Sequence, residues 1–192
     1  MSGGDVVLVA SLGRSPPVIT EAVDALIEMG LRPSRVYVVT TSDPTIIQRC
    51  IPILRDEFAV RYPGVGLEVR TLTRDDIYDE KDNEEFMKMV ADILYEESIL
   101  RESHVYLSLA GGRKTMSAVM AILGWIYGAK AIIHVLVPPD VERRGHIENL
   151  ERLGPEERGA IMHPSSDVRR IVVLKLGMPP PLPTDIIKKI GG

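Results

Sequence analysis

Cysteine is almost absent from this chain, because Cys50 is the single one among 192 residues. No disulfide can form within the chain, and no metal cluster can be built from thiolates. We therefore expect a reducing compartment, and the N-terminus carries no basic segment followed by an apolar one that would direct export. No apolar run is long enough to span a bilayer. These absences predict a cytoplasmic protein without membrane contacts.

An excess of basic residues is also lacking. The 23 Lys and Arg residues are outnumbered by 27 Asp and Glu residues, which gives a formal net charge of -4. This balance argues against a protein that coats long nucleic acid through its bulk charge. A local basic pocket is still compatible with it, so any nucleic-acid ligand should be small and held by a few cations.

Strand and helix patterns alternate regularly along the chain. Short runs rich in valine predict strands at 5–10, 35–40, 67–72, 104–109, 130–137 and 168–176. Apolar residues at helical spacing predict helices at 18–29, 45–62, 83–99 and 114–127, the second of them perturbed at Pro52. The alternation predicts an α/β, Rossmann-like fold, with a mostly parallel sheet and helices on both of its faces.

Length and composition predict one domain over residues 1–192, since hydrophobic residues make up 45% of the chain. Residues 139–166 are polar, and we interpret them as an insertion that is largely irregular with a short helix. This insertion could cover a ligand site as a lid or serve an interface. Residues 177–192 form a short C-terminal extension that begins with a proline-rich, extended stretch.

Three of the predicted strands end in loops with small, hydroxyl and cationic residues. Ligands of open α/β sheets bind at the carboxyl ends of the strands, and the helix starts that follow favour anions. The residues expected to contact ligand there are Leu12, Gly13, Arg14, Thr40, Thr41, Ser42, Ala110, Gly111, Gly112, Arg113 and Thr115. For the loop at 40–42, a capped turn is the competing interpretation.

The stretch Leu107–Ser117 looks like a cradle for phosphate, although it fails two familiar templates. A P-loop needs lysine directly after its second glycine, but Arg113 stands between Gly112 and Lys114, and the G-x-G-x-x-G spacing is absent. Glycines let a ligand approach the backbone, arginine can contact phosphate with two bonds, and lysine supplies a mobile charge. The alternative is a helix start with glycines for packing and exposed cations.

Patterns for metal binding are missing as well. None of the four histidines has the spacing of a metal site, and no H-E-x-x-H occurs. We interpret the acidic residues at 75–82 as a solvated loop, and we expect neither a metal nor another cofactor. Ser11 suits a turn as well as a ligand contact. Lys175 would join the site only if the last strand runs parallel to the others.

Two motifs resemble those of the CRISPR-associated Rossmann fold (CARF) family. One is S-L-G-x-S-P-x-V-[IV]-T-E at Ser11–Glu21, and the other is S-x-A-G-G-R-K-T-M-S at Ser108–Ser117. The order of predicted strands and helices agrees with this family over most of the chain. Within the family, the chain is similar to the stand-alone proteins called ring nucleases.

The resemblance implies a homodimer that binds a cyclic oligoadenylate, the second messenger of type III CRISPR immunity, on its two-fold axis. Ring nucleases of this group cleave cyclic tetra-adenylate without metal into linear di-adenylate with a 2′,3′-cyclic phosphate, which switches the signal off. The ribose 2′-hydroxyl attacks its own phosphodiester, so the protein mainly positions it. The resemblance assigns catalytic roles to Ser11 and to a lysine, which is Lys114 or Lys175.

Two other functions stay open at this point. The chain could be a sensor that holds cyclic oligoadenylate without cleaving it and acts through a partner, or an unrelated nucleotide-binding α/β enzyme. Arg158–His163 also matches the R-x4-H string of HEPN ribonucleases. We do not assign that activity, because Gly154, Pro155 and Pro164 bracket the string and too few residues remain for a helical bundle.

Overall fold

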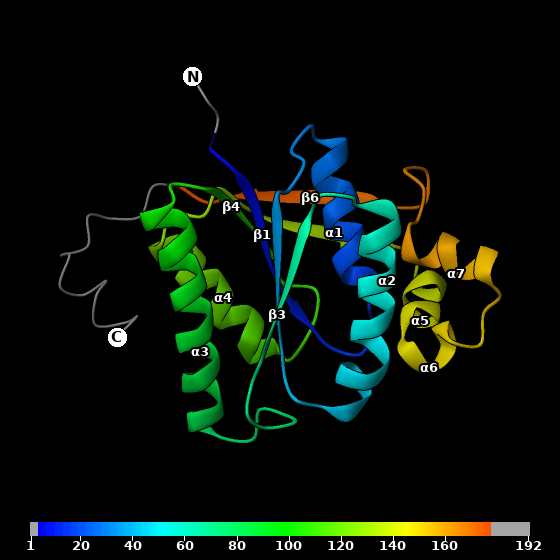
Figure 1. Ribbon diagram of the computed structural model, residues 1–192, viewed down its shortest axis with the longest axis horizontal. Helices are drawn as coiled ribbons and strands as arrows, with labels where there is room; N and C mark the ends of the chain where they lie inside the picture. Colours follow the sequence, from blue (N-terminus) through cyan, green and yellow to red (C-terminus); the bar gives the residue numbers. More distant parts are fainter. Residues whose placement is uncertain (1–3, 178–192) are drawn as a thin grey trace.

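The computed structural model describes residues 4–177, which form one six-stranded sheet covered by helices (Figure 1). The strands lie in the order β3-β2-β1-β4-β5-β6. Their bounds are β1 Val6–Leu12, β2 Arg35–Thr40, β3 Gly66–Thr71, β4 His104–Ser108, β5 Ala131–Leu136 and β6 Arg170–Lys175. This architecture confirms the predicted α/β, Rossmann-like fold.

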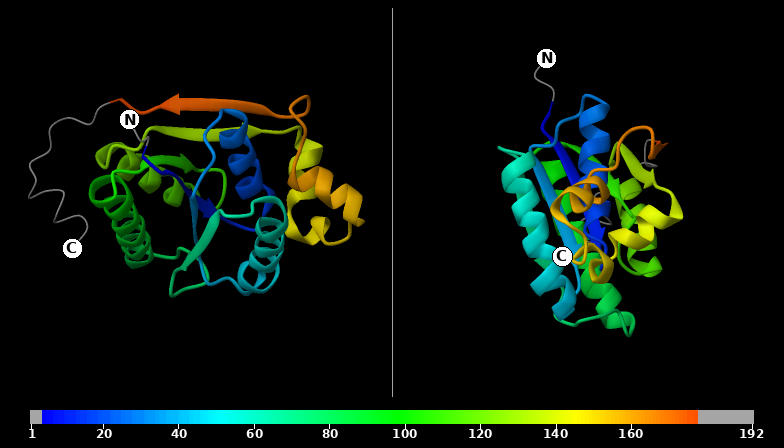
Figure 2. Two further views of the ribbon diagram at one scale, coloured as in Figure 1. Left: turned by 45° about the horizontal axis from the view of Figure 1, so that its top comes forward. Right: turned by 90° about the vertical axis from the view of Figure 1, so that its right-hand side faces the viewer.

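Five strands run parallel, and the last one does not. The β1–β2, β2–β3, β1–β4 and β4–β5 pairs are parallel, whereas β6 pairs with β5 in the antiparallel direction. Two neighbouring strands that are joined at the same edge of the sheet run antiparallel. A parallel pair needs a connection that crosses back to the opposite edge before the next strand begins. Here the helical segment between β5 and β6 ends beside the carboxyl end of β5, so the chain returns in the opposite direction (Figure 2).

Helices cover both faces of the sheet (Figures 1 and 2). Helices α1 (Pro17–Glu28) and α2 (Ile51–Arg61) pack on one face, and α3 (Glu80–Leu94) and α4 (Lys114–Ile126) pack on the other. Alternate residues of β1 point to opposite faces: Leu8 and Ala10 join the α1–α2 core, whereas Val7 and Val9 join the α3–α4 core. This double burial explains why the central strands read as continuous apolar runs.

Two of the predicted helices contain a π-helical turn. The predicted helix at 45–62 is split into η1 (Ile46–Cys50) and α2, and α3 continues into η2 (Tyr95–Leu100). Pro52 directly follows the π-helical turn, inside a helix that is continuous over residues 44–61, where proline cannot donate the usual helical hydrogen bond. The predicted perturbation at Pro52 is confirmed.

The polar segment at 139–166 is helical and packed, so the expectation of a largely irregular insertion is wrong. It forms α5 (Pro139–Gly145), α6 (Ile147–Leu150) and α7 (Pro155–Met162). The apolar residues that dock these helices on the α1–α2 core are Ile147, Leu150, Ile161 and Met162, all of them buried. These few anchors were hidden in a sequence dominated by charges and prolines, which is why composition alone suggested a loop.

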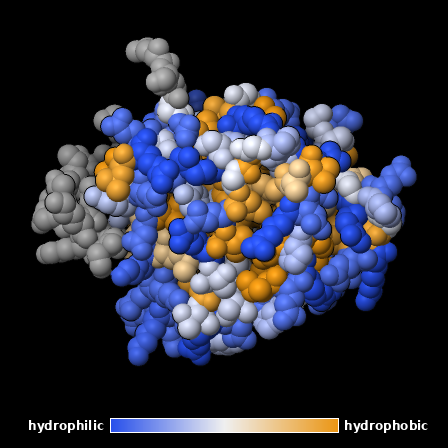
Figure 3. Space-filling model, in the orientation of Figure 1, coloured by the Kyte–Doolittle hydropathy of each residue, from blue (hydrophilic) through white to orange (hydrophobic). Residues whose placement is uncertain are grey.

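The outer surface agrees with this layered core. In the view of Figure 3 hydrophilic residues cover the outer sides of α2 and α3, and apolar residues gather between them, along the edge formed by β3. No helix within residues 4–177 is both long and apolar enough to cross a membrane. Apart from Gly177, the predicted C-terminal extension lies outside the described residues.

Candidate functional site

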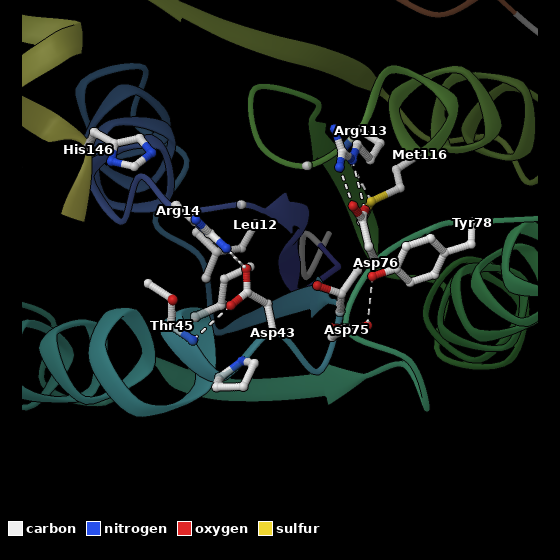
Figure 4. Close-up of a pocket in the computed structure, with 15 residues that line it drawn as sticks. Leu12, Arg14, Asp43, Thr45, Asp75, Asp76, Tyr78, Arg113, Met116 and His146 are labelled. Carbon is white, nitrogen blue, oxygen red and sulfur yellow. Dashed lines mark hydrogen bonds and ion pairs between the residues drawn. The ribbon is translucent and has the colours of Figure 1, made fainter. Parts of the chain in front are cut away.

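The strand order reverses between β1 and β4, and a cleft of about 660 Å³ opens beside this switch point (Figure 4). In open α/β sheets this is where ligands bind. The walls come from the loops that follow β1, β2, β3 and β4, together with Ile46 of η1, Met116 of α4 and His146 from the turn between α5 and α6. The cleft therefore lies where the sequence placed it.

The two glycines of the loop after β4, Gly111 and Gly112, are needed for different structural reasons. A Cβ on Gly111 would lie 2.3 Å from the Ser11 carbonyl oxygen, so this loop can press against the end of β1 only without a side chain. Gly112 has a φ of +80°, a left-handed conformation that glycine adopts without strain. Both glycines thus have a structural reason, and the loop leaves Arg113 and Lys114 at the start of α4, exposed to solvent.

Hydroxyl side chains tie the loops of the site together. The Ser11 hydroxyl is fully buried and donates to the Gly111 carbonyl over 2.7 Å. The Thr40 hydroxyl donates to the Leu12 carbonyl over 2.9 Å, and the Ser42 hydroxyl donates to the Thr73 carbonyl over 3.0 Å. These three side chains fix the positions of the loops, and they do not line the cleft.

Each arginine in the cleft is paired with an aspartate (Figure 4). The Arg14 Nε donates to an Asp43 carboxylate oxygen over 2.8 Å, and the Thr45 backbone N–H donates to the other oxygen. Burial tends to raise the pKa of Asp43, but these hydrogen bonds outweigh it and lower the pKa. Asp43 thus stays ionised and holds the Arg14 guanidinium beside the carboxyl end of β1.

The second pair joins α4 to the loop after β3. Arg113 donates through Nε and one terminal nitrogen to both carboxylate oxygens of Asp76. This fork lowers the pKa of Asp76 to about 2. A guanidinium can bind a phosphate group with the same planar, two-bond geometry.

Lys114 lies on a neighbouring cavity of about 550 Å³, which shares Tyr78 and Arg113 with the main cleft. Thr115 lines this second cavity as well. Lys114 is solvent-exposed, and no carboxylate within residues 4–177 forms a salt bridge with it. The Lys114 side chain is therefore mobile, and it lies beside Arg113.

The structure brings most of the predicted ligand-contacting residues to this edge of the sheet. Those that line the main cleft are Leu12, Gly13, Arg14, Thr41, Gly112 and Arg113. Ala110 lines a separate small cavity behind the same loop. Gly111, Thr40 and Ser42 serve the packing of the loops instead.

Lys175 lies at the opposite edge of the sheet, so the condition for its inclusion fails. It pairs with Ala131, the first residue of β5, whereas the carboxyl end of β5 pairs with Arg170. The antiparallel direction of β6 therefore carries Lys175 away from the cleft. Of the two lysines named by the family resemblance, Lys114 is the one beside the site in this chain.

Sequence reasoning missed the acidic half of the cleft. Asp43, Asp75, Asp76 and Tyr78 line it, although the acidic loop was interpreted as solvated. That interpretation is wrong for Asp76, which faces Arg113. A signal was present, because β3 is also a parallel strand and its following loop must reach the same edge. His146 had no such signal, since only the docking of α5 and α6 brings it there.

The other histidine of the polar segment is structural. His163 makes hydrogen bonds of 2.9 Å with Asp24 and 3.0 Å with Glu57, which join α7 to α1 and α2. Arg158, the other end of the R-x4-H string, donates to the carbonyls of Glu151 and Leu153. Within residues 4–177, no group of three or more His, Cys, Asp or Glu side chains is placed to hold a metal ion.

Comparison with known proteins identifies relatives of this chain. The family model described as CRISPR-associated protein NE0113 matches residues 15–176. The CRISPR system ring nuclease SSO2081 of Saccharolobus solfataricus is 34% identical over 139 residues, which cover 70% of this chain and 73% of that protein.

Solved structures with a similar fold include two larger proteins. Enterococcus italicus Csm6, bound to cyclic hexa-2′-fluoro-hexa-dAMP, gives a TM-score of 0.57 at 14% identity and covers 98% of this chain and 45% of its own. Can2 of Sulfobacillus thermosulfidooxidans, in complex with cyclic tetra-adenylate, gives a TM-score of 0.46 at 18% identity and covers 71% and 33%. The chain thus spans less than half of either protein.

The likeness to Csm6 concerns the fold alone, whereas the family match covers the site from Ser15 onward and leaves out Leu12, Gly13 and Arg14. It includes Arg14's neighbour Ser15, the loops after β2 and β3, and the GGRK loop at 111–114. The resemblance to CARF proteins seen in the two motifs is thereby confirmed. On the strength of the family match and the curated relative, this chain belongs to the family of the CRISPR-associated protein NE0113.

Proposed function

We propose that this chain is a ring nuclease, which binds cyclic tetra-adenylate and cleaves it without metal to linear di-adenylate with a 2′,3′-cyclic phosphate. The observation that carries the proposal is the cleft at the switch point, which Arg14 and Arg113 line, with Lys114 on the cavity next to it. A relative of 34% identity is named a CRISPR system ring nuclease, which supports the same reaction. In the cytoplasm such an activity would switch off type III CRISPR signalling.

The chemistry needs little more than positioning and charge. The substrate supplies its own nucleophile, the ribose 2′-hydroxyl, so holding it in line with the leaving 5′-oxygen is the main task. Arg113 can grip a phosphate with two bonds once it leaves Asp76, and Lys114 can stabilise charge that grows on the phosphoryl oxygens. The resident carboxylates keep both arginines extended into the cleft until an anion replaces them.

Ser11 acts in this proposal as a positioning residue. Its hydroxyl is buried and holds the Gly111 carbonyl, so it sets the loop that carries Arg113 and Lys114. This role takes the place of the direct ligand contact that the sequence allowed for Ser11.

We also propose that the active form is a homodimer built on the exposed face of α4. Lys114, Ala118, Ile122 and Trp125 follow one another at helical spacing, and all four are exposed. Ile122 and Trp125 leave 59% and 40% of their surface open to solvent. A second copy that covers this stripe would place the two Lys114 side chains near one two-fold axis, where a symmetric ring can contact both.

The test compares two lysines that lie at opposite edges of the sheet. Purified protein is incubated with labelled cyclic tetra-adenylate in EDTA, and the products are separated. We expect Lys114→Ala to lower the single-turnover rate roughly 100-fold or more, a typical loss for one charge-stabilising group. Lys175→Ala, the matched control, should cleave at the wild-type rate, because its side chain lies away from the cleft.

The outcomes separate the alternatives. An intact ring that shifts the protein in a gel indicates a sensor that acts through a partner, and it contradicts the enzymatic part of the proposal. Tight binding of ATP or NAD without binding of the ring indicates another nucleotide enzyme. An unchanged rate in Lys114→Ala contradicts the role given to this residue.

A further inference from the structure

One histidine reaches the main cleft from outside the strand-end loops. Of the four histidines, all of which lie within residues 4–177, His146 is the one that lines the cleft. It is half-buried, in the turn between α5 and α6. No hydrogen bond or salt bridge joins its ring nitrogens to any other group within residues 4–177. An imidazole in this situation is free to exchange a proton with a ligand.

The turn that carries His146 is fixed against the loop after β1. The Ile147 backbone N–H donates to the Arg14 carbonyl over 2.8 Å. A Cβ on Gly145 would lie 3.2 Å from the Pro17 Cγ, so the turn packs closely on the start of α1. The backbone on either side of His146 is therefore held in place by residues at or beside the cleft.

An ion pair fixes the other end of α6. Arg49 of η1 donates through Nε and one terminal nitrogen to the carboxylate of Glu151, which directly follows α6. Ile46, the first residue of η1, lines the cleft as well. The helices that carry His146 are thus attached to two elements of the cleft wall.

The other ionisable side chains of the cleft are poor proton donors near neutral pH. Both arginines keep their protons at any ordinary pH. Hydrogen bonds from arginine keep the pKa of Asp76 low, and that of Asp43 low in spite of its burial, so both are ionised. The Tyr78 hydroxyl donates to Asp75 over 3.1 Å, and a phenol is a weak acid. Among the described residues that line the cleft, His146 is the one suited to give up a proton.

We infer that His146 is the general acid of the ring cleavage, and that its imidazolium protonates the 5′-oxygen as this oxygen leaves phosphorus. The inference rests on the proposed function and adds a catalytic residue to it. The bond from the 2′-oxygen to phosphorus forms while the bond from phosphorus to the 5′-oxygen breaks. The 2′-hydroxyl proton passes to water, and the neutral imidazole regains its proton from water. Such proton transfer typically contributes 10²–10⁴-fold to a rate.

The arrangement of the cleft suits this role. In an in-line displacement, the attacking and leaving oxygens lie on opposite sides of phosphorus, and cations contact the remaining oxygens. Figure 4 shows that Arg113 and His146 enter the cleft from different elements, Arg113 from the start of α4 and His146 from the α5–α6 turn. A phosphate held by Arg113 can therefore direct its leaving oxygen toward a separate proton donor.

The experiment compares two rings that differ only in the leaving atom. One is cyclic tetra-adenylate, and the other has sulfur in place of each bridging 5′-oxygen, so that a thiolate leaves without needing a proton. Single-turnover cleavage is measured in EDTA. We expect His146→Ala to cleave the ordinary ring roughly 100-fold or more slowly than wild type. It should cleave the sulfur ring at the wild-type rate.

Two further variants are controls. Lys114→Ala should be slow on both rings, because charge grows on the phosphoryl oxygens in either reaction. His134→Ala should match wild type on both, since His134 is exposed on β5 and lines a separate cavity. Binding is measured with an uncleavable ring, cyclic tetra-adenylate with fluorine in place of each 2′-hydroxyl, and His146→Ala should leave its affinity unchanged.

The outcomes separate proton donation from a structural role. Equal slowing of His146→Ala on both rings, or an unchanged rate on the ordinary ring, overturns the inference and leaves the proposed function standing. If His146→Ala does not fold, His146→Gln, which keeps a polar side chain without the acid, takes its place in the comparison. If wild type leaves both rings intact, the inference and the proposed cleavage are both overturned.

Discussion

At the scale of single residues, the cleft holds its cations by giving each arginine a counter-charge. Asp43 and Asp76 imitate the anion that the site is proposed to bind, and both carboxylates have a lowered pKa. A group with a lowered pKa stays ionised above its unfolded value and loses its stabilising effect only as the pH falls through the folded value. Neutral pH therefore never releases Arg113, and the anionic ligand itself must displace Asp76.

Removal of this competitor should tighten binding. We expect Asp76→Asn to raise the affinity for the uncleavable ring up to roughly 5-fold, since an exposed ion pair is worth ~0.2–1 kcal/mol. Asp75→Asn is the control, because it removes the same charge from the same loop but leaves the fork between Arg113 and Asp76 intact. Weaker binding of Asp76→Asn than of Asp75→Asn would mean that Asp76 orders Arg113 for the ligand, and would contradict simple competition.

At the scale of elements, the helices between β5 and β6 are secured by a cluster around His163. Its ring nitrogens reach Asp24 on α1 and Glu57 on α2, and the Tyr62 hydroxyl donates to the same Asp24 over 2.6 Å. These hydrogen bonds come from residues far apart in the sequence, so no local pattern revealed them. They explain how a segment rich in charge becomes a fixed part of the fold.

We expect His163→Ala to lower the free energy of unfolding by ~1–3 kcal/mol, because Asp24 and Glu57 each lose a hydrogen bond in a partly buried cluster. Glu57→Gln is the milder comparison, since its amide oxygen can still accept a hydrogen bond from the ring. Urea unfolding followed by circular dichroism measures both. Equal stability of His163→Ala and wild type would show that apolar docking alone holds α7.

The sequence predicted the bounds of helices and strands well where the hydrophobic periodicity was strong. The β2 strand begins and ends at the predicted residues, and α1 and α4 lie within one residue of their predicted bounds. The acidic loop after β3 and the polar segment were misjudged, because charge and proline suggest solvent exposure until a partner is known. Arg113 supplies that partner for Asp76, and the α1–α2 core supplies it for α6 and α7.

At the scale of the whole molecule, the proposed dimer makes a prediction about assembly. We expect Trp125→Glu to convert the dimer into a monomer and to lower ring cleavage, because it buries a charge in the apolar stripe of α4. Val60→Glu is the control, since Val60 lies on α2 and is 80% exposed. Light scattering after size exclusion measures the mass of each protein.

A wild-type protein that is monomeric at micromolar concentration would contradict this assembly, as would a Trp125→Glu protein that stays dimeric. Cleavage by a wild-type monomer at the full rate would contradict the shared site. The Val60→Glu protein should match wild type in both mass and rate.

The sequence by itself determined the α/β class, the edge of the sheet at which the cleft lies, and the two arginines that line it. These follow from periodicity and from the rule that parallel strands bring their carboxyl ends to one edge. Only the tertiary structure decided that β6 runs antiparallel, which removes Lys175 from the site, and that Ser11 is buried beneath Gly111. It also decided that Asp76 pairs with Arg113 and that His146 lines the cleft. Such facts depend on contacts between distant parts of the chain, which no local pattern records.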